Sequence, residues 1–222
     1  MFQSIILDIE TIPCERQDVR DFIAKGVQPP ATYKLADSIA KWHKEQGPAA
    51  IDEAVNKTGL DGAFGRICCV GYALDDSSDP ESIYGDEAYI LNQFNKALDA
   101  IPANMWSATT VVGHNVASFD LRFLLQRYIV NGIKPHPIIN VAARAKPWEE
   151  TKIFDTMIQF AGIGKTISLD KLCMALGIEG KGDISGADVW PMYQAGKIIE
   201  IAAYCRHDIQ ITREVYRRMT FQ

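Results

Sequence analysis

Short apolar runs alternate with longer stretches of helical spacing along most of the chain. Apolar runs rich in isoleucine, leucine and valine predict buried strands over residues 4–9, 66–74, 81–84 and 108–114. Helical spacing of apolar positions predicts helices over residues 86–100, 118–131, 168–177, 186–194 and 197–220. Strands followed by helices predict an α/β fold, with a mixed central β-sheet flanked by helices.

The segment between the first two predicted strands, residues 12–65, has little strand character. It contains Pro13, Pro29 and Pro30, followed by helical stretches near 33–45 and 49–57. It is too short to bury much core alone, so we interpret it as a helical insertion after the first strand, within a single domain spanning residues 1–222. Residues 135–148 are interrupted by prolines, which predicts a loop.

Composition bounds the class of protein. A chain of 222 residues with 47% hydrophobic content can build one compact α/β domain with a sizeable insertion. It has no run of eighteen apolar residues and no signal-peptide pattern, so we expect a soluble, cytoplasmic protein with no membrane partner. The five cysteines form no CxxC pair, which favours reduced thiols in the core over zinc or disulfides.

Charge changes this picture in one respect. The formal net charge of −5 argues against broad electrostatic binding to nucleic acid. It is compatible with a protein that grips only the end of a strand, and part of the acidity belongs to the residues described next.

Three short segments carry the chemistry. Asp8 and Glu10 alternate on the first strand, so both side chains leave the same face. Asp120 follows the strand over 108–114, and Tyr204 and Asp208 lie four residues apart on one face of the last helix. Carboxylates from separate elements rarely converge without a cation, and hard oxygen ligands suit Mg²⁺ or Mn²⁺.

Together these segments resemble the DEDD superfamily of 3′–5′ exonucleases, which has a ribonuclease H-like fold. Its first motif, DxE, is matched by Asp8 and Glu10, and its second, NxxxFD, by Asn115, Phe119 and Asp120. The third motif, in its YxxxD form, is matched by Tyr204 and Asp208.

The chain is therefore similar to the tyrosine branch of the superfamily, which includes polymerase proofreading domains. The likeness to the exonuclease domain of family B DNA polymerases covers residues 1–11 and 66–222 and is weak over 12–65.

The resemblance implies a role for each of these residues. Asp8 would bridge two divalent cations, Mg²⁺ or Mn²⁺, with Glu10 and Asp208 completing the site that activates water. Asp120 would hold the second cation. Tyr204 would orient the attacking water through its hydroxyl, since an unperturbed pKa near ~10 does not suit a general base.

Other positions keep two readings each. Asn115 either contacts substrate or caps the turn between strand and helix, and Phe119 either stacks on a terminal base or packs in the core. Lys181 lies between glycines and is either a phosphate contact or an exposed turn residue. Thr11, next to the first motif, is a further candidate for substrate binding, and Asp155 either faces the site or serves turn chemistry.

The function that follows is a metal-dependent 3′–5′ exonuclease. It would hydrolyse phosphodiester bonds at the 3′ ends of single-stranded DNA, or of RNA, and release 5′-mononucleotides by a two-metal mechanism. The alternative is a non-hydrolytic module that keeps the fold and binds nucleic acid or a polymerase. A polymerase or replication partner in trans is compatible with both, and the sequence leaves DNA versus RNA, pathway, oligomeric state and the role of residues 12–65 open.

Overall fold

The computed structural model describes residues 4–75, 78–180, 182 and 184–222 of the chain. The chain divides into two compact units, one made of Met1–Glu10 with Ile67–Gln222 and the other of Thr11–Arg66. The organisation of residues 1–222 as a single domain stays a prediction.

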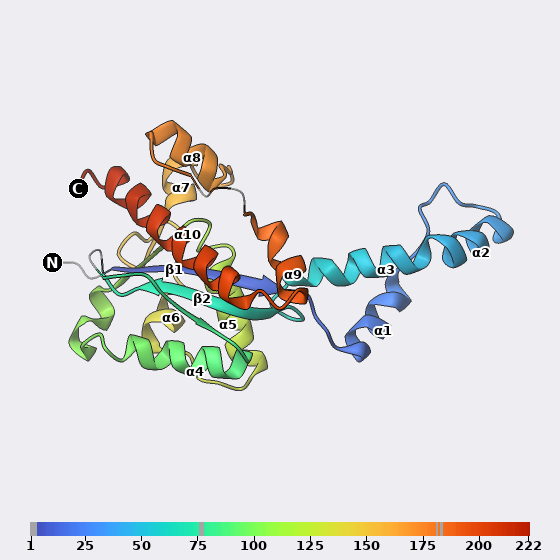
Figure 1. Cartoon of the computed structure of the whole chain (residues 1–222), viewed down its shortest axis with the longest axis horizontal. Helices are drawn as coiled ribbons and strands as arrows, with labels where there is room; N and C mark the ends of the chain where they lie inside the picture. The colour runs from blue at the N-terminus through green and yellow to red at the C-terminus, as the bar shows by residue number, and fades with distance from the viewer. Residues whose placement is uncertain (1–3, 76–77, 181, 183) are drawn as a thin grey trace. The chain divides into compact units, whose positions relative to one another are not determined.

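A mixed β-sheet forms the centre of the first unit (Figure 1). Its strands are β1 (Ser4–Ile12), β2 (Arg66–Ala73), β3 (Glu81–Tyr84), β4 (Thr110–Gly113) and β5 (Ile153–Asp155). Within the described residues their order is β3-β2-β1-β4-β5, so β1 is central. β4 lies parallel to β1 and to β5, whereas β3 is antiparallel to β2.

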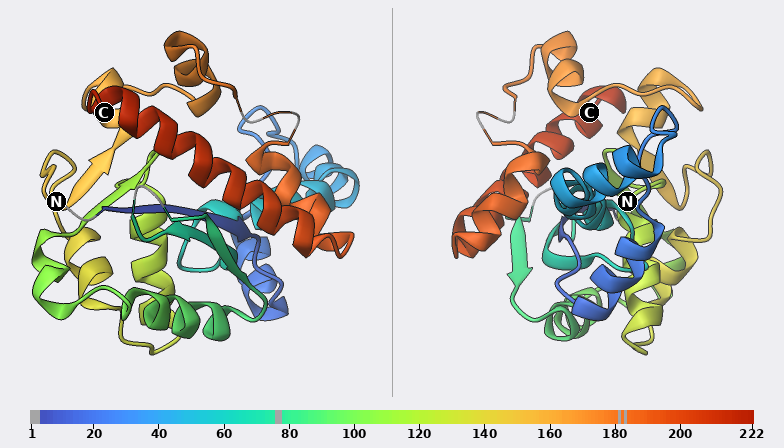
Figure 2. Two further views of the ribbon diagram at one scale, coloured as in Figure 1. Left: turned by 60° about the vertical axis from the view of Figure 1, so that its left-hand side comes forward. Right: turned by 90° about the vertical axis from the view of Figure 1, so that its right-hand side faces the viewer.

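Helices cover both faces of this sheet (Figures 1 and 2). In Figure 1 and in the left view of Figure 2, the lower face carries α4 (Glu87–Leu98), α5 (Asp120–Val130) and α6 (Pro137–Ala142), and the opposite face carries α10 (Ile198–Met219). The other helical segments of this unit are η2 (Ala103–Ala108), α7 (Thr156–Ala161), α8 (Leu169–Leu176) and α9 (Gly186–Gln194). The α/β fold with helices flanking a mixed sheet is therefore confirmed.

Alternation along β1 decides which core each residue joins. Ile5, Leu7 and Ile9 pack into the main core with buried residues of α4, α5 and α6. Ile6, between them, packs instead in a smaller cluster with Ile209 of α10. Because strand side chains alternate between the two faces, positions 8 and 10 share the α10 face with Ile6. The sheet thus directs both acids of the first motif toward α10.

The second unit is helical. It contains α1 (Gln17–Gly26), α2 (Ala36–Glu45), α3 (Gly47–Asn56) and the short η1 (Lys57–Leu60). The helices predicted near 33–45 and 49–57 correspond to α2 and α3, so the helical insertion after the first strand is confirmed. α1 was not predicted, although Val19, Phe22 and Ile23 lie at helical spacing within it.

Two expectations from the sequence need correction. The loop predicted over 135–148 contains α6, which accommodates Pro137 because a proline in the first helical turn loses no intrahelical hydrogen bond. β1 also continues to Ile12, past the predicted end at Ile9. The boundaries of α8 agree with prediction, since the Ser168 side chain accepts from the Lys171 amide at 3.3 Å and Gly177 ends the helix with φ of 66°.

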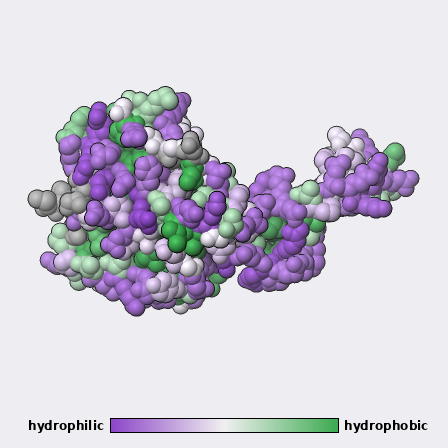
Figure 3. All heavy atoms as spheres, in the orientation of Figure 1, coloured by the Kyte–Doolittle hydropathy of each residue, from purple (hydrophilic) through white to green (hydrophobic). Residues whose placement is uncertain are grey.

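All five cysteines are buried and none forms a disulfide in the structure, and the reduced state of these core thiols stays a prediction. On the face drawn in Figure 3, small hydrophobic patches are separated by hydrophilic atoms. None of the helices formed by the described residues has both the length and the apolar character needed to cross a bilayer.

Candidate active site

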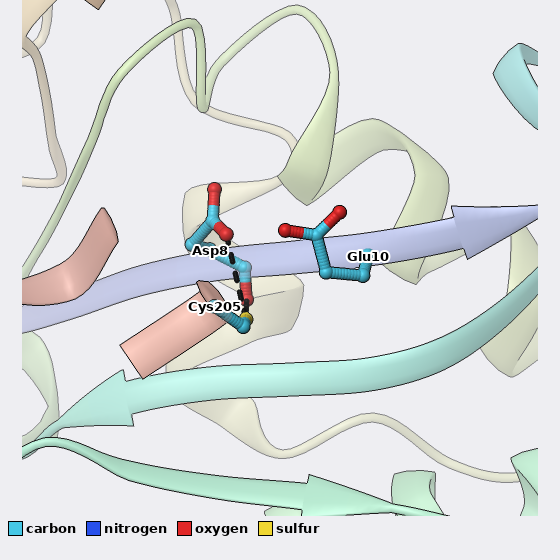
Figure 4. Close-up of side chains that lie close together, drawn as sticks. All are labelled: Asp8, Glu10 and Cys205. Atoms are coloured by element: carbon cyan, nitrogen blue, oxygen red, sulfur yellow. Dashed lines mark hydrogen bonds between the residues drawn. The ribbon is translucent and has the colours of Figure 1, made fainter. Parts of the chain in front are cut away.

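The acidic site is built on the central strand. Asp8 is partly buried and Glu10 is 6% exposed, and both carboxylates leave the same side of β1 (Figure 4). One potential ligand atom each from Asp8, Glu10 and Cys205 lie within 4.8 Å of one another. The first motif therefore meets α10, which carries the third.

Asp120 reaches this group from the start of α5. Its side chain is 3% exposed, and its Oδ1 accepts a hydrogen bond from the backbone amide of Ile9 at 3.0 Å. Ile9 is the residue between Asp8 and Glu10, so the bond ties the second motif to the first. Burial, and next the nearby charge of Asp8, raise the pKa of Asp120 well above its ordinary value.

The third motif lies on α10. Tyr204 and Asp208 are 6% and 2% exposed, and Cys205, next to Tyr204, contacts Asp8. The Cys205 Sγ lies 3.4 Å from the Asp8 Oδ2 and 3.8 Å from the Asp8 carbonyl oxygen. The turn of α10 that carries the motif therefore packs against β1. Within the described residues, the close group of ligand atoms does not extend to Asp120 or Asp208.

A glycine on β2 permits this approach of the helix. A Cβ atom at Gly71 would lie 2.6 Å from the Sγ of Cys205 and 3.2 Å from its carbonyl oxygen. Both distances are shorter than ordinary van der Waals contact, so a larger residue at position 71 would push α10 away from the sheet.

Cys205 was not predicted to be part of the site. A hydrogen bond with Cys69, followed by burial, raises the pKa of the Cys205 thiol. Cys205 is therefore a neutral thiol here, and the charged donors are carboxylates. Its position between Tyr204 and Asp208 was the only signal in the sequence, and that signal does not reveal a contact with Asp8.

The donor set fits a hard divalent cation. Asp8, Glu10, Asp120 and Asp208 offer carboxylate oxygens, and the raised pKa of Asp120 reflects the cost of placing its charge in a buried position beside another acid. A divalent cation would offset that cost, because its charge is opposite to theirs.

Two of the predicted substrate contacts lie in the segment between β4 and α5. Asn115 adopts a left-handed conformation with φ of 62°, and its backbone amide donates to Asp155. Phe119 is partly buried next to the main core, with its ring centroid 5.6 Å from that of Phe123. These contacts accord with the structural reading of both residues, and a substrate role for either stays a prediction.

The other two residues predicted to contact substrate are Thr11 and Lys181. Thr11 belongs to the second unit, where its hydroxyl donates to the Gly59 carbonyl oxygen at 2.6 Å. Lys181 lies outside the described residues.

Fold and site together define the class: an α/β protein whose central strand and flanking helices gather buried carboxylates suited to a divalent cation. A protein-family model matches residues 67–222 and is described as a predicted 3′–5′ exonuclease related to the exonuclease domain of PolB. The chain belongs to this family. The match includes Asp120, Tyr204 and Asp208 but begins after the strand that carries Asp8 and Glu10. A search of curated proteins found no match.

Proposed function

We propose that this chain is a metal-dependent 3′–5′ exonuclease of the tyrosine branch. It removes 5′-mononucleotides from the 3′ end of single-stranded nucleic acid, with DNA preferred to RNA. Family membership supports the reaction class, and the YxxxD spacing of Tyr204 and Asp208 supports the branch.

The observation that carries this proposal is the junction at Ile9. Its amide, flanked by Asp8 and Glu10, donates to Asp120 at 3.0 Å, so acids separated by more than one hundred residues converge. Such convergence has a cost in buried surroundings, which is visible in the raised pKa of Asp120. Proteins keep costly carboxylate clusters where the chemistry needs them.

Each residue has a role in this proposal. Asp8, Glu10, Asp120 and Asp208 would hold two cations, Mg²⁺ or Mn²⁺. Bound there, the cations would activate water, neutralise charge on the reacting phosphate and stabilise the departing 3′ oxygen. Tyr204 directs its hydroxyl to the attacking water and fixes its orientation, without acting as a ligand.

The charge of the chain supports an end-binding enzyme. A net charge of −5 is unfavourable for coating a long polyanion, whereas one terminal phosphodiester needs only local neutralisation. Asn115, Phe119, Thr11 and Lys181 are the residues that we propose contact the strand. A polymerase or replication protein acting in trans is the partner that the family relationship suggests.

The test uses a single-stranded DNA oligonucleotide labelled at its 5′ end and the same sequence as a closed circle. With Mg²⁺ or Mn²⁺ we expect stepwise shortening of the labelled linear strand, release of the labelled 5′-terminal nucleotide only at the end, and no cleavage of the circle. A chelator should stop the reaction. Cleavage of the circle, or activity that persists in chelator, would contradict the proposal.

A matched pair of variants assigns the activity to this site. Glu10→Gln replaces a buried acid of the cluster, whereas Glu150→Gln replaces an exposed acid of the same unit. We expect the first variant to lose detectable hydrolysis and the second to keep the wild-type rate. If the wild-type protein binds single strands but hydrolyses none under any metal condition, the non-hydrolytic binding module is the correct reading.

A further inference from the structure

Asp155 is a buried acid outside the four carboxylates of the proposed exonuclease site. It is 0% exposed at the end of β5, and its carboxylate accepts four backbone hydrogen bonds. Two come from the segment after β4, from Asn115 to Oδ1 and from Ala117 to Oδ2, each at 3.0 Å. Two come from the first turn of α7, from Met157 at 3.0 Å and Ile158 at 3.3 Å, both to Oδ1. One side chain therefore joins two separate segments.

The segment held by Asp155 leads directly to Asp120. β4 ends at Gly113, which pairs with Asp155 of the neighbouring strand. The chain then turns sharply, with Asn115 at φ of 62°, an uncommon conformation for a residue with a Cβ atom. A Cβ atom at Gly113 would lie 2.6 Å from the Cβ of Val116, so this turn packs tightly against the end of the strand.

The residues beside Asn115 and Asp155 form a second connection. His114 Nδ1 lies 2.9 Å from the Thr156 hydroxyl, and Nε2 lies 2.9 Å from the Ile167 carbonyl oxygen. A carbonyl only accepts, so Nε2 carries the proton that is donated to Ile167. His114 and Asn115 are thus bonded to Thr156 and Asp155, and these contacts fix the path of the chain toward α5.

We propose that Asp155 is a positioning residue for the exonuclease reaction. It holds residues 114–119 in the conformation that delivers Asp120 to the Ile9 amide and to the acids of β1. It acts through the backbone and does not touch substrate. This inference rests on the proposed function, and it goes beyond it by assigning a role to an acid outside the three motifs.

The chemistry of the four bonds makes a carboxylate necessary. Both of its oxygens accept and neither donates. In Asp155→Asn the oxygen can keep the three bonds made by Oδ1, but the new NH₂ group would face the Ala117 amide, donor against donor. The change therefore weakens the connection to the segment and spares the cap of α7.

A second variant, with a smaller side chain, separates the two roles of Asp155: the cap of α7 and the hydrogen bonds to the segment after β4. Asp155→Ser keeps a good N-cap for α7, because a serine hydroxyl accepts from the first helical turn. A single hydroxyl cannot also accept from both Asn115 and Ala117. The matched control is Asp86→Asn, since Asp86 caps α4 through Ala88 and Tyr89.

The experiment measures Mn²⁺ affinity by calorimetry on the full chain without nucleic acid, and single-turnover cleavage across a Mn²⁺ series. Partners that orient a metal ligand are typically worth about 10–100-fold in affinity or activity. We expect both Asp155 variants to weaken Mn²⁺ binding by roughly that factor, raise the Mn²⁺ needed for half-maximal cleavage, and leave the substrate KM within about threefold. Asp86→Asn should change none of these quantities.

The outcomes separate this inference from the proposed function. Wild-type Mn²⁺ affinity in both Asp155 variants overturns the positioning role, even if their melting temperature falls. If the wild type binds Mn²⁺ but cleaves nothing, the exonuclease proposal fails, and weaker binding in the Asp155 variants still supports the positioning of Asp120. If the wild type binds no Mn²⁺, both the exonuclease proposal and the positioning proposal fail.

Discussion

Asp120→Asn should make the metal-free protein more stable while it removes the proposed activity. Asp120 is 3% exposed, and burial, together with the charge of Asp8, raises the pKa of its carboxyl group. Asparagine has nearly the same shape, and its Oδ1 can still accept from the Ile9 amide. The variant therefore removes a poorly solvated charge and leaves the packing and this hydrogen bond in place.

The direction of the pKa shift determines how the effect depends on pH. A raised pKa in the folded state means that folding favours the protonated acid. In the wild type this contribution to stability is fully present below the ordinary carboxyl pKa of 3.8, and is lost as pH rises through the raised value. Asparagine does not titrate, so the advantage of the variant should be larger at pH 8 than at pH 5.

The magnitude follows from the cost of burying a polar group without full compensation, which is about 1–3 kcal/mol in proteins. For a protein of this size, 1 kcal/mol corresponds to a Tm change of roughly 2–4 °C. The variant should therefore melt roughly 2–12 °C above the wild type at pH 8 in the presence of a chelator.

Thermal unfolding at pH 5 and pH 8, with chelator and then with Mn²⁺, measures this difference. Mn²⁺ should raise the Tm of the wild type more than that of the variant, because the variant lacks one ligand charge. The exposed Glu150→Gln change should shift the Tm little under any condition. If Asp120→Asn is less stable than the wild type at pH 8 in chelator, the charge of Asp120 does not destabilise the folded protein and the reasoning is wrong.

Three further predictions concern α10 and the core. Tyr204→Phe should keep Mn²⁺ affinity and lower single-turnover cleavage by about 10²–10⁴-fold, whereas Asp208→Ala should weaken both, as calorimetry and quenched-flow assays can show. Gly71→Ala should lower the free energy of unfolding by about 1–3 kcal/mol in urea, and adding Cys205→Ala should restore part of it, because the added methyl meets the Cys205 sulfur. Glu87 of α4 forms a buried ion pair with Arg127 of α5. Glu87→Gln leaves the charge of Arg127 without this partner, so it should lower the free energy of unfolding by about 3–5 kcal/mol in the same urea assay and leave Mn²⁺ affinity unchanged.

The strands and helices that carry the motifs were predictable because their patterns are local. Isoleucine and leucine around Asp8 and Glu10 indicate a buried strand, and the strand period alone places both acids on one face. The spacing of Tyr204 and Asp208 likewise places them one helical turn apart. These inferences need only neighbouring residues.

What the sequence could not provide depends on contacts between distant residues. Cys205 contacts Asp8, which is 197 positions away in the sequence, and Asp155 accepts a hydrogen bond from Asn115, which is 40 positions away. No local pattern encodes either pairing. α7 has only six residues, so it does not offer enough helical periods to recognise.

The position of β1 has a consequence for how the protein forms during synthesis. β1 is the central strand of the sheet, yet its neighbour β4 begins at Thr110, and most of the second unit lies between β1 and β2 in the sequence. At the ribosome's pace of about 5–20 residues per second, β1 therefore waits roughly 5–20 s before β4 exists to pair with it. The second unit is completed within that interval. A nascent chain that stops between Ala73 and Thr110 would have β2 to pair with one edge of β1 but would leave the edge meant for β4 unpaired, and an unpaired apolar strand edge favours association with other chains.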